Sequence, residues 1–185
     1  MRQDAAYQAE LADDKLKLIV QAAPLHDIGK VGIADHILRK PGSLTPEEFA
    51  IIKTHSRIGG DAIALAIQRV KEADHSSYPV DGYPLAFLDV ARQIAMWHHE
   101  RWDGGGYPDG LAGPAIPLAA RIMALADVFD VVTTKRVYKQ AQPVSHAIST
   151  IAQERGSQFD PTLVEVFISL RPELEAIALR LADTG

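Results

Sequence analysis

The sequence contains no cysteine, which excludes disulfide bonds and thiolate metal ligands. It also lacks an apolar run of membrane-spanning length, and its polar beginning does not resemble a secretory signal peptide. The formal net charge is -5, with no acidic or basic block, which argues against a general nucleic-acid binder. An anionic ligand would therefore be recognised by a few local cations. These absences favour a cytoplasmic location and no membrane segment in this chain.

What is present is ordinary globular composition, with 47% hydrophobic and 23% charged residues. A chain of 185 residues fits one domain with a sizeable core, so we expect a single domain over residues 1–185. No stretch sustains a two-residue alternation of apolar and polar side chains, so we expect little or no sheet. The expected fold class is all-α.

Helical signals cover most of the chain. Thr45-Pro46-Glu47-Glu48 has the form of a capping box with proline at the first helical position. Apolar residues behind it recur at helical spacing, beginning with Phe49. The expected helices cover residues 14–26 with a bend at Pro24, 45–70, 87–98 and 117–134, and a further one is capped by Asp160-Pro161 after Gly156.

Two polar segments, residues 72–84 and 103–117, are expected to form long loops. The second contains three consecutive glycines, at 104–106, and three prolines. Gly82-Tyr83-Pro84 and Gly106-Tyr107-Pro108 match each other. Because the second lies beside a histidine pair, we interpret the first as chance.

Two pairs of residues stand out chemically: His26-Asp27 and His98-His99. A single histidine on an apolar helix face is usually a core residue with a hydrogen-bond partner. Here His55 and His98 both lie on the apolar stripes, and His26 ends a third apolar helix. Several inward-facing imidazoles are costly to bury unless something satisfies them together. A metal ion would do so.

Asp127 lies within an apolar run, residues 122–129, where an isolated carboxylate would be expensive to bury. Coordination to a cation would remove that cost. The alternative is a structural ion pair, with Arg121 as one candidate partner. Asp130 follows by about one helical turn and could orient a metal-binding side chain without itself contacting the metal.

These residues define a metal site without sulfur. The expected ligands are four imidazoles and two carboxylates: His26, Asp27, His55, His98, His99 and Asp127. Mixed nitrogen and oxygen ligation suits Fe, Mn, Co, Ni or Zn better than Mg or Ca. Six ligands fit two divalent transition-metal ions, with Asp27 bridging them. Iron and manganese are the metals that we favour. Paired ions about 3.5–4 Å apart can generate hydroxide and stabilise an in-line phosphoryl displacement.

Other polar residues receive smaller roles. Lys30 follows Asp27 by three residues, so a continuing helix would place it on the side of the ligands, where it could touch a phosphate oxygen. The alternative is a solvated lysine at a helix end. The remaining histidines lie outside these patterns and should be dispensable: His36, His75 and His146.

Four segments in order resemble the HD-GYP family, a branch of the HD phosphohydrolase superfamily, and the likeness spans nearly the whole chain. They are residues 26–30 (HDIGK), 98–108 (HHERWDGGGYP), 126–130 (ADVFD) and 156–161 (GSQFDP). The pair HD alone would be a weak signal, whereas the four segments in sequence are a specific one.

The resemblance implies an all-α HD-superfamily helical bundle with a glycine-rich GYP loop and a centre of two or three metals. It also implies hydrolysis of cyclic di-GMP to pGpG, and to GMP after a second cleavage. Asp27 and Lys30 would be catalytic, with Lys30 at the scissile phosphate and Tyr107 at the lip of the substrate site. Three residues would hold substrate phosphate and base: Arg136, Tyr138 and Lys139.

The sequence departs from the family pattern at three points. Val137 and Ala34 stand where prolines are usual. The family usually has an upstream helix with a metal-binding histidine, and residues 7–18 contain none. We therefore expect a longer bacterial parent protein with an N-terminal receiver or sensor domain, of which this is the output domain. The glycine-rich loop could also dock a GGDEF-type cyclase.

Two alternatives remain beside a cyclic di-GMP phosphodiesterase. One is a related HD phosphohydrolase that acts on another cyclic dinucleotide or on a nucleotide monophosphate. The other is a non-catalytic module that binds cyclic di-GMP or docks on a partner. Degenerate modules would be expected to lose the HD or HH residues, and this sequence keeps both pairs, which favours an enzyme.

Overall fold

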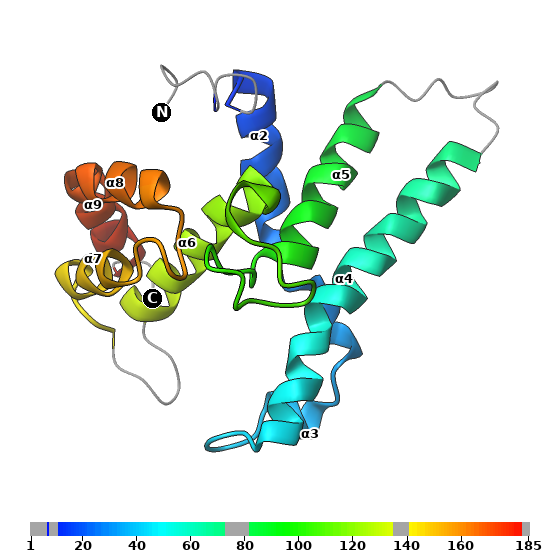
Figure 1. The fold of residues 1–185 in the computed structure, drawn as a ribbon, viewed down its shortest axis with the longest axis horizontal. Helices are drawn as coiled ribbons and strands as arrows, with labels where there is room; N and C mark the ends of the chain where they lie inside the picture. The colour runs from blue at the N-terminus through cyan, green and yellow to red at the C-terminus, as the bar shows by residue number, and fades with distance from the viewer. Residues whose placement is uncertain (1–6, 8–10, 73–81, 135–140, 183–185) are drawn as a thin grey trace.

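The computed structural model describes residues 7, 11–72, 82–134 and 141–182, and within these ranges the fold is helical (Figure 1). In chain order the α-helices and the 3-10 helices, labelled η, are α2 (Asp13–Ala22), η1 (Ala23–Leu25), η2 (Ile28–Gly32), α3 (Asp35–Leu38), α4 (Pro46–Glu72), α5 (Gly82–Trp97), η3 (Gly113–Ala115), α6 (Leu118–Thr133), α7 (Val144–Gln153), α8 (Pro161–Ser169) and α9 (Arg171–Ala182). Within the described ranges there is no strand, and one isolated bridge joins Arg155 to Phe159. The all-α prediction is confirmed. In the same ranges no helix is both long and apolar enough to cross a bilayer.

Two helices, α4 and α8, begin with the capping residues that the sequence indicates. The Thr45 N–H donates to Glu48 Oε2 at 2.8 Å, and the Glu48 N–H donates to Thr45 Oγ1 at 3.2 Å, so the capping box before α4 is formed. The Asp160 carboxylate accepts hydrogen bonds from the N–H groups of Thr162 and Leu163 at the start of α8. Both predicted starts are confirmed.

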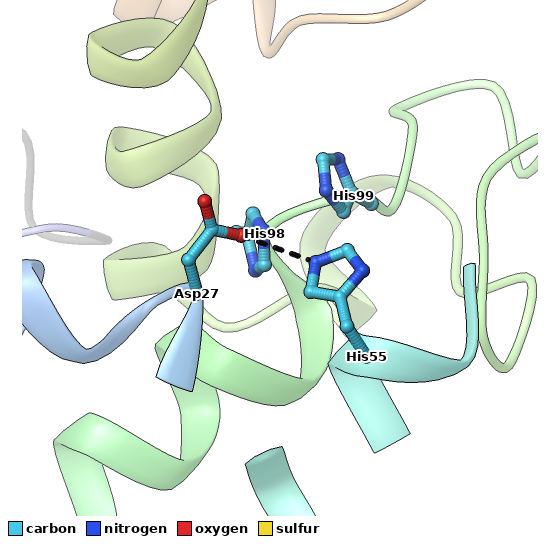
Figure 2. Close-up of side chains that lie close together, drawn as sticks. All are labelled: Asp27, His55, His98 and His99. Carbon is cyan, nitrogen blue, oxygen red and sulfur yellow. Dashed lines mark ion pairs between the residues drawn. The ribbon is translucent and has the colours of Figure 1, made fainter. Parts of the chain in front are cut away.

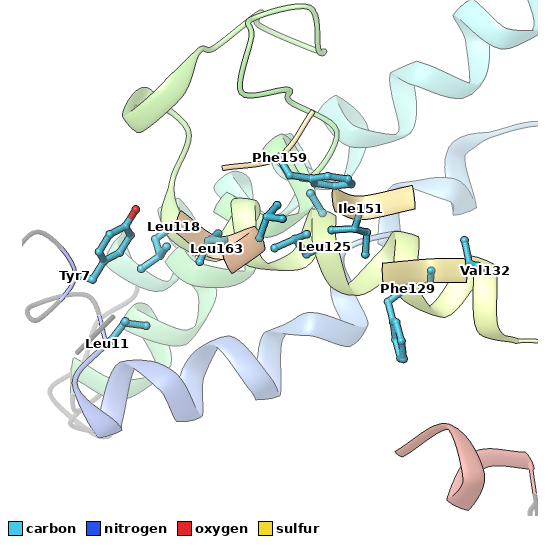
Figure 3. Packing of buried hydrophobic residues seen from close by; sticks show 12 residues of the cluster. Tyr7, Leu11, Leu118, Leu125, Phe129, Val132, Ile151, Phe159 and Leu163 are labelled. Atoms are coloured by element: carbon cyan, nitrogen blue, oxygen red, sulfur yellow. The ribbon is translucent and has the colours of Figure 1, made fainter. Parts of the chain in front are cut away.

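The helices form two groups on either side of α6. In Figure 1, α4 and α5 run side by side as a long pair, with α2 beside α5. The helices α7, α8 and α9 gather on the opposite side of α6. One core cluster lies among α2, α4 and α5 and includes Ile63, Ala91 and Ile94. The other lies around α6, α7 and α8 and includes Leu125 and Ile151 (Figure 3).

The apolar stripes are only partly buried. On α5 the predicted stripe faces the core, with Ala91, Ile94 and Ala95 fully buried. On α4 the prediction is wrong for Phe49, whose side chain is 47% exposed. Phe49 lies in the first turn of α4, and its ring borders a cavity rather than the core.

The segment from α2 to α3 crosses α4 at close range. α2 ends at Ala22, and Pro24 lies in the 3-10 helix η1 that follows, so the predicted helix over residues 14–26 ends earlier than expected. The chain then continues through η2. A Cβ atom at Gly29 would lie 1.9 Å from the His55 carbonyl oxygen and 2.5 Å from the Gly59 nitrogen. Only glycine permits this approach, which brings Asp27 next to α4.

The first predicted loop, residues 72–84, differs from the structure at both ends. Glu72 is the last residue of α4, and α5 begins at Gly82, so the predicted loop ends three residues too late. Pro84 lies in the first turn of α5, where proline is tolerated. Residues 73–81 lie outside the described part of the chain. The glycine-rich loop (residues 103–117) is confirmed as a loop, with η3 as its one regular turn.

Candidate metal centre

Four of the expected ligands converge on one point. One ligand atom from each of Asp27, His55, His98 and His99 can be chosen so that all four lie within 4.8 Å of one another. Figure 2 shows these side chains pointing toward a common centre. Asp27 comes from the turn before η2, His55 from α4, and the histidine pair from the turn directly after α5. Segments far apart in the sequence thus build one site.

The polar atoms at this centre lack hydrogen-bond partners. Within the described part of the chain, four buried side-chain atoms have no hydrogen-bond partner: Asp27 Oδ1, His55 Nε2, His98 Nε2 and Ser56 Oγ. Three of them belong to the converging group. Burying polar atoms without partners is costly, so such atoms are rare in folded proteins. Their concentration at one point fits a divalent metal ion as the missing partner.

The histidines are held in the state that binds metal. His55 Nδ1 lies 2.6 Å from the Ile52 carbonyl oxygen, and His98 Nδ1 lies 2.9 Å from the Ile94 carbonyl oxygen. Each Nδ1–H therefore donates to its own helix, which leaves the Nε2 lone pair directed at the centre. Burial lowers the pKa of His98 to about 4, and burial with the nearby His98 lowers the pKa of His99 to about 2. Both imidazoles are neutral at neutral pH, as metal ligands must be.

Asp27 directs its two carboxylate oxygens to different neighbours. Oδ2 accepts a hydrogen bond from Lys30 Nζ and lies 3.2 Å from His26 Nε2. Oδ1 lies 3.3 Å from His55 Nε2. Burial opposes ionisation, but the surrounding polar groups, His26 first and then His55 and Lys30, hold the pKa of this carboxyl well below its usual range. The carboxylate is therefore ionised at neutral pH.

The other two expected ligands, His26 and Asp127, lie beside the group of four. The hydrogen bond to Asp27 is the main cause that raises the pKa of His26, against the effect of burial. The His26 and His98 rings lie 5.3 Å apart between centroids. Asp127 is half-buried and lines the same cavity as His98 and His99. Arg121, the alternative partner considered for Asp127, donates to Asp160 at 2.7 Å.

A cavity of about 270 Å³ opens next to the centre. Its walls include the His98-His99 pair, Asp127 and Tyr107. The Tyr107 ring stacks on the His99 ring, with 4.8 Å between centroids and 28° between planes. Burial, with the nearby Asp27 and Asp127, raises the pKa of Tyr107, so its hydroxyl stays protonated and can donate a hydrogen bond. A ligand in this cavity would meet an aromatic face, a hydroxyl and the residues expected to bind metal.

The family of this chain follows from its similarity to known proteins. The sequence model of the HD domain matches residues 3–163. This chain belongs to the HD domain family. The family that the HD-GYP resemblance implied is thereby confirmed.

Two curated relatives and one solved structure show how this HD domain compares. It is 44% identical over 179 residues to a Vibrio cholerae protein named cyclic di-GMP phosphodiesterase, covering 97% of this chain and 34% of that protein. It is 38% identical over 173 residues to the 3'3'-cGAMP-specific phosphodiesterase 2 of Vibrio cholerae, covering 94% and 30%. A crystal structure of a Vibrio cholerae cyclic GMP-AMP-specific phosphodiesterase matches the fold with a TM-score of 0.55 at 22% identity, covering 96% and 45%. The chain thus spans about a third of the length of these curated relatives.

The glycine-rich loop of this HD domain is fixed by a residue to which the sequence reasoning gave no role. Glu100 is 3% exposed, and its carboxylate accepts hydrogen bonds from three consecutive backbone N–H groups. The donors are Asp109 at 2.7 Å, Gly110 at 3.1 Å and Leu111 at 3.0 Å. An acidic residue directly between a histidine pair and a glycine-rich loop is the signal that could have indicated this anchor.

Weakening the anchor is expected to loosen the loop. In Glu100→Gln one carboxylate oxygen becomes an NH2 group, which cannot accept from the backbone, and buried N–H groups lose a partner. We expect a loss of about 1–3 kcal/mol in the free energy of unfolding, measured by urea denaturation. The control is Glu165→Gln, which removes an exposed ion pair with Arg155 and should cost at most about 1 kcal/mol. If the two variants lost the same free energy of unfolding relative to the unaltered protein, the anchoring role of Glu100 would be contradicted.

The remaining predicted residues divide into three groups. Lys30 reaches Asp27, but through the 3-10 helix η2 rather than the continuing helix that we expected. His36 lies on α3 and His146 on α7, outside the group of converging ligands. The predicted substrate residues Arg136, Tyr138 and Lys139, with His75, lie outside the described residues.

Proposed function

We propose that the chain is the catalytic domain of a metal-dependent phosphodiesterase that hydrolyses cyclic di-GMP. The product would be linear pGpG, and a second cleavage would give GMP. The observation that carries the proposal is the set of partnerless buried atoms on Asp27, His55 and His98, of which His98 also lines the cavity. The printed name of the relative at 44% identity supports the substrate.

The proposed ligands of two divalent transition-metal ions are those expected from the sequence: His26, Asp27, His55, His98, His99 and Asp127. Asp27 would bridge the ions, which is supported by its two oxygens facing His26 on one side and His55 on the other. Iron or manganese is the favoured pair, with zinc, nickel or cobalt as alternatives. When bound, such ions supply a hydroxide nucleophile at neutral pH and neutralise developing charge.

The protein's own residues would bind and orient the substrate. Lys30, placed by its contact with Asp27, would approach the scissile phosphate. Tyr107 would donate a hydrogen bond from its hydroxyl to a substrate oxygen, from the stacked position on His99. The cations Arg136 and Lys139, with Tyr138, would hold phosphate and base, because charge-assisted contacts suit a doubly anionic dinucleotide.

A second candidate substrate is 3'3'-cGAMP. It is favoured by the 38% identity to a protein whose name specifies that dinucleotide. The metal ligands would serve either substrate, since both contain the same kind of phosphodiester bond. The non-catalytic binding module is less well supported, because four of the six expected ligands converge on one point.

The experiment that tests the function is a substrate panel with the full-length, metal-loaded protein. Cyclic di-GMP, 3'3'-cGAMP and a nucleoside monophosphate would be supplied separately, and products followed by chromatography. We expect pGpG from cyclic di-GMP at the highest kcat/KM. Intact cyclic di-GMP beside hydrolysed 3'3'-cGAMP would make the second candidate the substrate. Binding without turnover of any substrate would favour the binding module.

Arg136→Ala should weaken substrate use without releasing metal. A charge-assisted contact to phosphate contributes about 1.5–3 kcal/mol, so kcat/KM for cyclic di-GMP should fall by roughly ten- to a hundred-fold. Elemental analysis should find the same metal content as in the unaltered protein. Asp127→Ala is the contrasting variant, which should lose both activity and metal. Loss of metal in Arg136→Ala would contradict its assignment as a phosphate contact.

Three further expectations stay predictions. They are the cytoplasmic location, an N-terminal receiver or sensor domain in the parent protein, and docking of a GGDEF-type cyclase on the glycine-rich loop. The length of the curated relatives, about three times that of this chain, leaves room for such a domain.

A further inference from the structure

An exposed aromatic ring borders the cavity on the side of α4. Phe49 is 47% exposed, although its position in the apolar stripe predicts burial. It lies in the first turn of α4 and belongs to the residues that line the cavity. A large apolar ring at the wall of a polar cavity offers a flat face to a ligand.

Lys53 lies one helical turn after Phe49 and also lines the cavity. Its ammonium nitrogen is 4.9 Å from the centroid of the Phe49 ring and 5.2 Å from the centroid of the Tyr107 ring. Such distances allow cation–π contacts. Among the residues that the structure describes, no carboxylate forms an ion pair with Lys53. The cation is therefore available to an anionic ligand.

These contacts form a continuous path from the metal centre to the protein surface. The His99 ring stacks on Tyr107 at 4.8 Å, Tyr107 contacts the ammonium of Lys53, and that ammonium contacts Phe49. The path starts at a proposed metal ligand, where one phosphodiester would be cleaved. A ligand that follows it outward would meet a hydroxyl, a cation and an exposed phenyl ring in turn.

The size of the cavity requires such an extension for a cyclic dinucleotide. Drug-sized ligands commonly occupy pockets of about 300–1,000 Å³. A cyclic dinucleotide is at least that large, whereas the cavity beside the centre has about 270 Å³. One nucleotide would fill the cavity, and the other would lie across its rim.

We propose that Phe49 and Lys53 form the subsite for the second nucleotide of the substrate, the one whose phosphodiester is not being cleaved. The inference rests on the proposed function and adds residues that the motifs do not contain. The Phe49 ring stacks on the base, and the Lys53 ammonium contacts the distal phosphate. Both are positioning residues, because they touch the substrate away from the reacting phosphorus.

The test compares two substrates that share the reacting group. Cyclic di-GMP carries the second nucleotide, whereas bis(p-nitrophenyl) phosphate is a diester with no base and no second phosphate. In the full-length, metal-loaded protein, Lys53→Met and Phe49→Ala should each raise KM for cyclic di-GMP by roughly ten-fold. The kcat for cyclic di-GMP should change far less, and kcat/KM should fall at least five-fold more for cyclic di-GMP than for the small diester.

Conservative and matched variants separate the subsite from a structural role. Lys53→Arg keeps the charge and Phe49→Tyr keeps the ring, so both should retain most of the affinity. Ile51→Ala and Lys71→Met alter exposed residues of α4 that do not line the cavity, and they should leave KM near its original value.

Two outcomes would overturn the inference, and they are distinguishable. If the altered proteins lost both substrates equally, or kept the original KM for cyclic di-GMP, the subsite would be wrong while the proposed function stood. If the unaltered protein cleaved only the small diester, the substrate assignment would fail and the subsite with it.

Discussion

Asp27→Ala is expected to lose bound metal and to reduce turnover of cyclic di-GMP by about a thousand-fold or more. Asp27 is the ionised carboxylate of the converging group, and one of its oxygens has no hydrogen-bond partner within the described residues. Metal ions contribute several kcal/mol of charge stabilisation to phosphoryl displacement. Since about 1.4 kcal/mol corresponds to a factor of ten in rate, a loss of about 4 kcal/mol gives this reduction.

Elemental analysis of the reconstituted protein checks the metal content, and a hydrolysis assay checks the turnover. His36→Ala and His146→Ala serve as controls, because both histidines lie outside the converging group and should keep metal and activity. Full activity of Asp27→Ala would remove Asp27 from the centre. Retained metal with lost activity would keep Asp27 catalytic but end its proposed role as the bridging ligand.

The second large effect is expected from Gly29→Ala, which adds a single methyl group. That Cβ would lie 1.9 Å from the His55 carbonyl oxygen and 2.5 Å from the Gly59 nitrogen, both backbone atoms of α4. Helix backbone cannot yield as a flexible side chain can, so η2 must move away from α4. Overpacking of this kind costs about 1–3 kcal/mol, and we expect the upper end. In a domain of this size, about 3 kcal/mol lowers Tm by roughly 6–12 °C.

The same movement should weaken the proposed metal centre. Asp27 directly precedes η2, and His55 lies on the opposing helix, so separating η2 from α4 pulls the two ligands apart. Thermal unfolding with and without added metal should therefore show a lower Tm and a smaller stabilisation by metal. Gly32→Ala is the matched control in the same 3-10 helix, because its Cβ would meet only side-chain atoms of Ile58, the nearest at 3.1 Å. Equal losses in both variants would contradict the close-approach argument.

The helices and most of the centre could be predicted from the sequence, because their signals are local. The capping box at Thr45 and the cap at Asp160 depend on atoms within three residues, and the structure forms both. His55 and His98 could be predicted as inward-facing, since each lies on an apolar stripe and is buried. Whether His26 and Asp127 lie close enough to join these ligands could not be predicted, because it depends on how the segments pack against one another.

The residues that the sequence mispredicts are those whose positions depend on contacts between distant segments. Phe49 fits the apolar period of α4 but is exposed, because the cavity, and not the core, lies next to the first turn of that helix. Lys30 was expected from a continuing helix, but the crossing over α4 forms a 3-10 helix instead. The sequence position of Glu100 could have indicated an anchor, but its partners could not be identified, because the three backbone donors lie nine to eleven residues further along the chain.

The sequence by itself determined which side chains would carry the chemistry and which segments would be helical, because periodicity, capping and residue type act over a few residues. Only the tertiary structure decided how those segments meet. The approach of Gly29 to α4 brings Asp27 to His55, and the return of the glycine-rich loop to Glu100 stacks Tyr107 on His99. Steric fit between backbones and the hydrogen bonds of a buried carboxylate fix these contacts, and both depend on atoms that are distant in sequence.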